Sequence, residues 1–273
     1  MLANTHIRAD RQPQSGWQLL REGFPDRPEI GPALSRVLLE QVSQGTRPAT
    51  IRLSRPGRVI AFGRRDVVAP GYRNAVRAAA AGGFPGMERI SGGRAAAFSE
   101  GALSLTLTLP DANPAKRTSQ RFEQWTGLLR EAFTELGADA RIGPVPAEYC
   151  PGEFSVNAGG RIKLAGVGQR MIRGGAHIGF VIMVSGSGIV AGVLGPVYEA
   201  LGLDFDPASV GSLEDELPGI GRGEVERAIL NRIEAALGSA GTPLIEAELD
   251  RPTLEEAESR AEDFRSDPAT GLI

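Results

Sequence analysis

Residues 148–170 combine a proline-containing loop with a tight hairpin, and this combination sets the local fold. Residues 157–160 read Asn-Ala-Gly-Gly, which is typical of a hairpin turn because Asn and Gly tolerate a positive φ angle. We therefore expect two short strands, 154–156 and 161–164, on either side of the turn. Side chains alternate between the two faces of a strand, so burial of its apolar neighbours turns Lys163 to the opposite face.

Lys163 is one of only two lysines, although Lys and Arg together number 30. A chain that uses Arg for most of its positive charge keeps Lys where a compact ammonium fits and a planar guanidinium does not. The glycines that follow, Gly166 and Gly168, leave the strand with little side chain, which suits a place where a ligand lies against backbone. Lys163 is therefore a candidate binding-site residue, and a solvated strand lysine is the alternative.

Cys150 is the only cysteine of the chain. Prolines on both sides of it, and Gly152 after it, interrupt regular structure, so we expect an exposed loop cysteine. An inert buried thiol is the alternative. A single cysteine excludes an internal disulfide, and with only His6 and His177 to accompany it, no metal site is expected.

His177 precedes the apolar run 178–184, which is typical of a buried strand. Because His6 lies in a polar segment, His177 is the one histidine that could pair with Cys150 in nucleophilic catalysis. The alternative is a histidine that is merely hydrogen-bonded within the fold. Both interpretations remain open.

A second informative segment reads Arg-Ile-Ser-Gly-Gly-Arg and begins at Arg89. Ser91, Gly92 and Gly93 allow the backbone to turn tightly and to approach a ligand closely. Arg89 and Arg94 place positive charge at both ends of this loop. The loop suits an anionic or carbonyl-bearing group, with an ordinary turn as the alternative.

Helix and strand patterns are interspersed along the chain. Residues 118–136 carry apolar side chains at helical spacing, and residues 103–109 alternate Leu with Ser or Thr as a strand does. Further helices are expected at 30–42, 70–81, 193–201, 223–237 and 254–265, and further strands from Trp17 and at 49–53, 58–62, 178–184 and 243–249. This mixture predicts an α/β (α+β) fold with one largely antiparallel sheet flanked by helices.

Composition narrows the class of protein. The 273 residues are 41% hydrophobic, which is ample for a core, and the net charge of -3 argues against bulk binding to nucleic acid. Neither an apolar run of membrane-spanning length nor a signal core is present, so we expect a cytoplasmic protein without a membrane partner. We expect a mobile tail at 1–15, one domain at 16–250 and a helical C-terminal tail at 251–273. The charged side chains of 254–265 predict that this helix is exposed.

Two motifs together resemble a known superfamily. The first is Arg-x-Ser-Gly-Gly, followed by small residues and an acidic-Gly step; the second is Tyr-Cys-Pro-Gly at 149–152, followed by G-R-I-K-L-A-G-V-G-Q-R at 160–170. They are similar to the lipoate–protein ligase and octanoyltransferase superfamily, which includes biotin–protein ligases. A cysteine loop shortly ahead of the lysine resembles the branch of octanoyl-[H protein]:protein N-octanoyltransferases, which use a cysteine thioester.

This resemblance implies roles for the candidate residues. Cys150 would be the acyl-accepting nucleophile, and Lys163 would lie beside the acyl carbonyl and form the rest of the catalytic pair. The resemblance also implies substrate-binding roles, which we assign to Arg89, Ser91, Gly92, Gly93, Gly166, Gln169 and His177. It implies no cofactor and no metal, and it makes 16–250 an acyltransferase domain.

The implied donor is octanoylated glycine cleavage H protein or acyl carrier protein, and the implied acceptors are lipoyl domains of 2-oxoacid dehydrogenases. A thiolate would accept the acyl group and a lysine amine would then displace it, which divides one difficult transfer into two easier ones. An ammonium such as Lys163 near Cys150 would favour the thiolate and stabilise a developing oxyanion.

Two other interpretations remain. In an ATP-dependent lipoate–protein or biotin–protein ligase, Lys163 would contact an acyl-adenylate and Cys150 would be incidental. Many ligases carry a third glycine where this chain has Arg94, and His-His-Gly where it has His177 followed by Ile-Gly, which disfavours adenylate binding. A catalytically silent acyl-binding module is the third interpretation.

Overall fold

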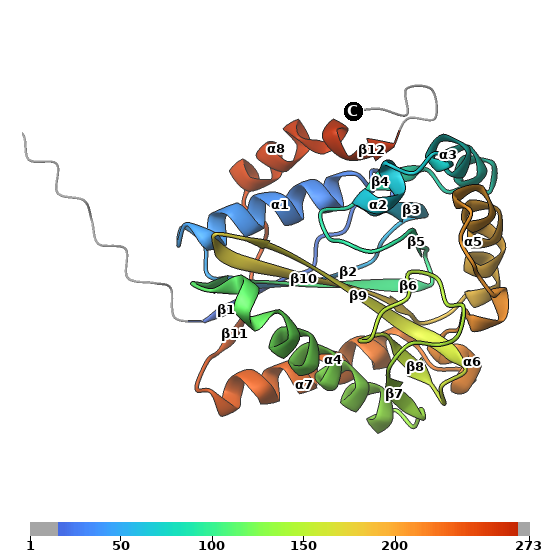
Figure 1. Cartoon of the computed structure of the whole chain (residues 1–273). Coiled ribbons are helices and arrows are strands. Elements are labelled where there is room, and N and C mark those ends of the chain that lie inside the picture. The colour runs from blue at the N-terminus through green and yellow to red at the C-terminus, as the bar shows by residue number, and fades with distance from the viewer. Residues whose placement is uncertain (1–15, 267–273) are drawn as a thin grey trace, which may run out of the picture.

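The computed structural model describes residues 16–266, which form two sheets with helices packed on them (Figure 1). The predicted mobile tail, 1–15, lies outside the described residues, as do residues 267–273. In Figure 1, α4 and α7 lie on one side of the larger sheet, and α1 and α8 lie on the other.

The larger sheet has eight strands among the described residues, in the order β11-β1-β2-β6-β10-β9-β8-β7. β1 pairs in parallel with β2 and β11, and the other neighbours are antiparallel. The prediction of a largely antiparallel sheet is therefore confirmed. The strands are β1 Trp17–Leu20, β2 Ala49–Ser54, β6 Ala102–Asp111, β7 Ala140–Ile142, β8 Val156–Ala158, β9 Ile162–Ile172, β10 Gly174–Met183 and β11 Leu244–Glu246.

A second sheet was not predicted. It has the order β12-β4-β3-β5 within the described part of the chain, with β3 Val59–Phe62, β4 Gly86–Glu88, β5 Ala96–Phe98 and β12 Arg265–Ser266. Three of these strands have three residues or fewer, which is too short for an alternating pattern to be recognised in the sequence. The expectation of a single sheet was therefore wrong.

The helices of the described chain are α1 Ile30–Ser43, α2 Arg64–Val67, α3 Tyr72–Ala81, α4 Thr118–Glu135, α5 Ser187–Leu201, α6 Leu213–Glu216, α7 Arg222–Ser239 and α8 Arg251–Ser259, with 3-10 turns η1 Pro114–Arg117, η2 Pro207–Ser209 and η3 Ala261–Phe264. The helices predicted at 30–42, 70–81, 118–136 and 223–237 are present within two residues at each end. The helix expected at 254–265 is α8 followed by a 3-10 turn, α2 and α6 were not predicted, and α5 begins earlier than predicted. α5 begins at Ser187 instead of 193 because buried Val190 and Leu194 pack against the small-sheet core. That packing overrides the low helix propensity of the glycines near its start.

One face of the larger sheet is packed against α4 and α7. Leu103, Leu105 and Leu107 of β6 are buried there in one apolar cluster with Phe133 of α4 and Ile229 of α7. This is the Leu face of the alternating strand predicted at 103–109. It supplies the main core.

The Ser/Thr face of the same strand is covered as well. Thr106 and Thr108 are only 8% and 1% exposed, because α1 and the small sheet lie over this face (Figure 1). An alternating pattern usually means one solvated face, but here the polar face is enclosed. It forms one wall of a pocket.

The C-terminal segment is not an exposed helix. Ala257, Ala261 and Phe264 are buried in one cluster with Leu34 of α1. The charged side chains that suggested exposure occupy only the outer face of α8 and η3. No helix in residues 16–266 is both long enough and apolar enough to cross a membrane.

Replacing Phe264 tests this C-terminal packing. We expect Phe264→Ala to lower the free energy of unfolding by about 3 kcal/mol, because a buried aromatic ring leaves a cavity. Val68→Ala is the control, since Val68 is 67% exposed and its loss should cost less than about 0.5 kcal/mol. Denaturant titration measures both values, and equal effects would contradict the packing described here.

Candidate active site

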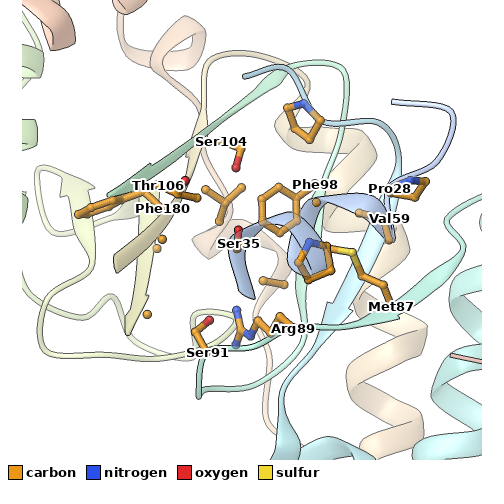
Figure 2. A pocket seen from close by; sticks show the side chains of 18 of the residues that line it. Pro28, Ser35, Val59, Met87, Arg89, Ser91, Phe98, Ser104, Thr106 and Phe180 are labelled. Atoms are coloured by element: carbon orange, nitrogen blue, oxygen red, sulfur yellow. The ribbon is translucent and has the colours of Figure 1, made fainter. Parts of the chain in front are cut away.

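A pocket lies between the polar face of the larger sheet and the small sheet. Val59, Met87 and Phe98 come from the small sheet, whereas Ser104 and Thr106 come from β6 on the other side (Figure 2). Cys150, Lys163, Arg89, Ser91, Gly166 and His177, all candidates from the sequence, also line it. The pocket therefore has one apolar wall and one polar wall.

Cys150 lies in a loop and is partly exposed, as predicted. Its φ angle is +44°, which is unfavourable for a residue with a Cβ atom. The Cys150 backbone N–H donates to Tyr198 Oη at 2.5 Å, and that hydroxyl donates to the Ala95 carbonyl at 2.8 Å. Tyr198 thus joins the cysteine loop to the residue after Arg94.

The Cys150 sulfur is held by two donors from the glycine-rich loop. Arg89 Nη2 and the Arg94 backbone N both lie 3.3 Å from Cys150 Sγ. Burial raises the pKa of the thiol, but the charges of Arg89 and Lys163 and these two hydrogen bonds outweigh it and lower the pKa below its ordinary value. The Lys163 charge lowers the thiol pKa, as predicted, and the Arg89 charge lowers it more.

The contact of the Cys150 sulfur with Arg89 and the Arg94 amide requires a glycine at position 93. A Cβ atom at this position would lie 2.5 Å from Arg89 Nη2 and 2.8 Å from Cys150 Sγ, and the φ angle is +106°. Only glycine combines that backbone angle with the absence of a side chain. Gly93 therefore lets the loop approach the sulfur.

Lys163 is completely buried beneath the cysteine loop. Its Nζ donates to the carbonyls of Tyr149 and Cys150, both at 2.9 Å, and forms an ion pair with Glu148 Oε1 at 3.3 Å. The Tyr149 ring centre lies 4.7 Å from the same nitrogen. Burial lowers the pKa of Lys163, and the nearby Cys150 and Glu148 charges oppose that shift.

The three polar partners use all three N–H groups of an ammonium. Lys163 therefore holds the loop that carries Cys150, instead of presenting a free donor to the pocket. Glu148, buried as well, also accepts from Gly152 N at 3.1 Å and Ser155 Oγ at 2.7 Å. Glu148 was not predicted as a site residue, although an acidic residue two positions before a loop cysteine was a signal.

The glycines after Lys163 have distinct contacts. A Cβ atom on Gly166 would lie 3.2 Å from Lys163 Cε, and one on Gly168 would lie 3.0 Å from Ser91 Oγ. The absence of these side chains lets Lys163 and Ser91 lie against β9. Gly92 does not line the pocket, although it belongs to the same loop.

Two predicted substrate-binding residues lie away from the sulfur. Gln169 accepts from Arg121 Nε at 2.9 Å and donates to the Thr118 carbonyl at 3.0 Å, so it ties β9 to α4 and does not line the pocket. His177 Nδ1 lies 3.2 Å from Thr108 Oγ1, and no hydrogen bond joins it to Cys150 in the described chain. Burial, assisted by the charge of Arg52, lowers the pKa of His177 to about 3, so the ring is neutral.

A further ion pair stiffens the glycine-rich loop. Arg94 Nη1 lies 3.2 Å from Oδ1 of Asp66, whose side chain is fully buried, and Asp66 also accepts from Gly63 N at 3.2 Å. The Arg94–Asp66 pair therefore anchors Arg94, whose backbone amide faces the Cys150 sulfur. Within residues 16–266, no group of three or more His, Cys, Asp or Glu side chains is arranged to hold a metal ion.

Two curated proteins are similar to part of this sequence. A curated octanoyl-[GcvH]:protein N-octanoyltransferase of Bacillus velezensis is 28% identical over 183 residues, which cover 64% of this chain and 62% of that protein. A lipoyl-[GcvH]:protein N-lipoyltransferase of Listeria monocytogenes is 24% identical over 171 residues, covering 60% and 61% respectively. The chain thus spans less than two thirds of the length of each of these two relatives.

The fold is shared with solved ligase structures. The crystal structure of a lipoate-protein ligase A bound with ATP superposes with a TM-score of 0.74 at 16% identity, covering 94% of this chain and 100% of that chain. The family model for the lipoyl protein ligase A/B catalytic domain matches residues 28–234, which is more than half of the sequence. The chain therefore belongs to the family of lipoyl protein ligase A/B catalytic domains.

Proposed function

We propose that this protein is an N-octanoyltransferase of protein lipoylation, which moves an octanoyl or lipoyl group through a thioester on Cys150. The observation that carries the proposal is the position of Cys150 Sγ, 3.3 Å from both Arg89 Nη2 and the Arg94 amide, on the wall of the pocket. The names of the relatives from Bacillus velezensis and Listeria monocytogenes support this reaction class.

In the first step the Cys150 thiolate attacks the carbonyl carbon of an octanoyl-lysine amide. A C–S bond forms, the C–N bond breaks, and the donor amine leaves with the proton that the thiol had released. Arg89 is poised beside the sulfur, and its buried Nε has no partner among residues 16–266. The guanidinium stabilises the thiolate before attack and the negative oxygen that forms during it.

In the second step an uncharged lysine amine of the acceptor attacks the thioester. The C–N bond forms, the C–S bond breaks, and the sulfur leaves as a thiolate while the amine proton is released. Lys163 keeps the cysteine loop in place through both steps by its bonds to the Tyr149 and Cys150 carbonyls. The apolar wall of the pocket limits the access of water to the thioester.

The donor that we propose is the octanoylated glycine cleavage H protein, with acyl carrier protein as the alternative. The acceptors are lipoyl domains of 2-oxoacid dehydrogenases. The relatives' names mention GcvH, which supports an amide donor. One lysine amide is exchanged for another, so the reaction needs no ATP.

The thioester is tested by intact-mass measurement. We expect the protein, incubated with octanoylated H protein, to gain one octanoyl increment on Cys150 and to pass it to a lipoyl domain. Cys150→Ser should lower the transfer rate about a thousandfold or more, because the nucleophile is lost. Free octanoate and ATP are the control substrates; octanoylation of the lipoyl domain from them by Cys150→Ala would instead identify an ATP-dependent ligase.

The lowered thiol pKa is tested by ultraviolet titration of the thiolate. We expect its midpoint below the free-cysteine value of about 8.5, so that transfer activity rises with pH through this lower pKa. Arg89→Met removes the charge that lowers the thiol pKa most and should raise the midpoint, and with it the rising limb of the pH profile.

Arg65→Met is the matched control for that titration, because Arg65 is exposed and makes no contact with Cys150. Its midpoint should equal that of the unmodified chain. An Arg89→Met midpoint that does not move would exclude Arg89 as the group that activates the sulfur.

A further inference from the structure

Two residues of the cysteine loop have an unfavourable backbone conformation. Ala147 and Cys150, with φ angles of +53° and +44°, are the non-glycine residues with a positive φ among residues 16–266. In this conformation a Cβ atom crowds the carbonyl oxygen, so the conformation persists only where the surroundings hold it. The contacts that hold these two residues therefore decide where the Cys150 sulfur lies.

Helix α5 and the turn that follows it hold both residues. The Cys150 backbone N–H donates to Tyr198 Oη, near the C-terminal end of α5, and the Asp206 backbone N–H donates to the Ala147 carbonyl at 2.9 Å. The helix is itself fixed, because Leu194 is completely buried in the small-sheet cluster and α3 packs beside α5 (Figure 1). No described residue of α5 lines the pocket, so these contacts act on the loop from outside the pocket.

The Tyr198 hydroxyl is one atom shared by the two loops of the site. It accepts from Cys150 N at 2.5 Å and donates to the Ala95 carbonyl at 2.8 Å. A phenol has a single O–H, so the Ala95 carbonyl uses its only donor. Ala95 follows Arg94, whose amide lies 3.3 Å from the sulfur. The buried hydroxyl therefore sets the separation between the Cys150 amide and the loop that faces the sulfur.

The hydroxyl keeps this role over the pH range in which the thiol ionises. Burial raises the pKa of Tyr198 well above its ordinary value, and the charges of Cys150 and Asp66 raise it further, so the O–H stays protonated. The charges that lower the thiol pKa belong to Arg89 and Lys163, and within residues 16–266 neither is hydrogen-bonded to Tyr198. Loss of the hydroxyl would leave both charges in place and change only the position of the sulfur relative to them.

We propose that Tyr198 is a positioning residue, whose hydroxyl holds Cys150 in the left-handed conformation that brings its sulfur against Arg89 and the Arg94 amide. The use of that position in acyl transfer rests on the proposed function, whereas the position itself rests on the contacts of the hydroxyl. The hydrogen bonds to the sulfur and the attraction of the guanidinium both weaken as the sulfur moves away. Without the hydroxyl, the Cys150 N–H and the Ala95 carbonyl would lose their shared partner.

Tyr198→Phe in the full chain tests the proposal. The ring that packs 5.0 Å from the Phe205 ring is retained, so we expect the variant to fold, which thermal melting checks. Ultraviolet titration of the thiolate should give a higher midpoint than in the unmodified chain, because the thiolate loses part of its stabilisation. Below that midpoint, alkylation of Cys150 by iodoacetamide should slow about threefold or more, as expected for the loss of one hydrogen bond.

Tyr72→Phe is the matched control. Tyr72 is buried in the same apolar cluster and donates to Ser266 Oγ at 2.8 Å, but it has no hydrogen bond to Cys150 in the described chain. Loss of its hydroxyl should leave the thiol midpoint unchanged. A midpoint that Tyr198→Phe does not move, or that Tyr72→Phe moves equally, would overturn the proposal.

A double-variant cycle separates positioning from a general loss of stability. If Tyr198 acts by placing the sulfur near Arg89, Tyr198→Phe should raise the midpoint less in an Arg89→Met background than in the unmodified chain. An equal rise in both backgrounds would show that the hydroxyl does not act through Arg89, and would also overturn the proposal.

The two proposals fail separately, because neither the titration nor the alkylation needs an acyl donor. If Cys150 never gains an octanoyl increment while Tyr198→Phe raises the thiol midpoint, the transferase assignment is wrong and the positioning role stands. If the increment appears on Cys150 and the midpoint does not move, the transferase assignment stands and the Tyr198 proposal is wrong.

Discussion

The site depends on the buried ion pair between Lys163 and Glu148. Transfer of two charged groups out of water costs several kcal/mol for each ion, and one contact between them at 3.3 Å does not by itself offset that cost. Further hydrogen bonds offset the remaining desolvation cost, because Lys163 Nζ also donates to two backbone carbonyls and Glu148 accepts from Gly152 and Ser155. All of these groups belong to the cysteine loop or to the strands beside it. The pair therefore fixes the loop, including the unfavourable φ angle of Cys150.

The loop fixed in this way meets a second loop that comes from the small sheet. The sulfur belongs to the loop ahead of β8, whereas Arg89 and the Arg94 amide follow β4. Their contact requires Gly93, since any side chain there would collide with both the sulfur and the guanidinium. The Arg94–Asp66 pair and Tyr198 hold the two loops at this separation. A lowered thiol pKa is thus a property of the junction between two sheets, and neither loop would produce it alone.

The contacts between these loops explain which features of the fold and of the candidate site were predictable from the sequence. The hairpin and the loop position of Cys150 follow from local turn chemistry, and the structure has both, with β8 at 156–158 instead of 154–156. The complete burial of Lys163 was not predicted, because alternation gives only the face of the strand to which the side chain belongs. Glu148 and Tyr198 were missed because their roles arise only where distant segments meet. A motif places a residue in the chain without giving the direction of its side chain, and the Gln169 side chain bonds Arg121 and the Thr118 carbonyl outside the pocket. The second sheet was not predicted because three of its four strands, β4, β5 and β12, are too short for a periodic signal.

The alternating strand 103–109 is the most instructive case. Its pattern correctly separated a Leu face from a Ser/Thr face, but periodicity cannot tell whether water or protein covers the polar face. Here α1 and the small sheet enclose it, which places hydroxyls, a neutral histidine and the Arg52 guanidinium on the floor of a pocket opposite Val59, Met87 and Phe98. The polarity of this wall therefore bears on which acyl groups the sulfur can receive.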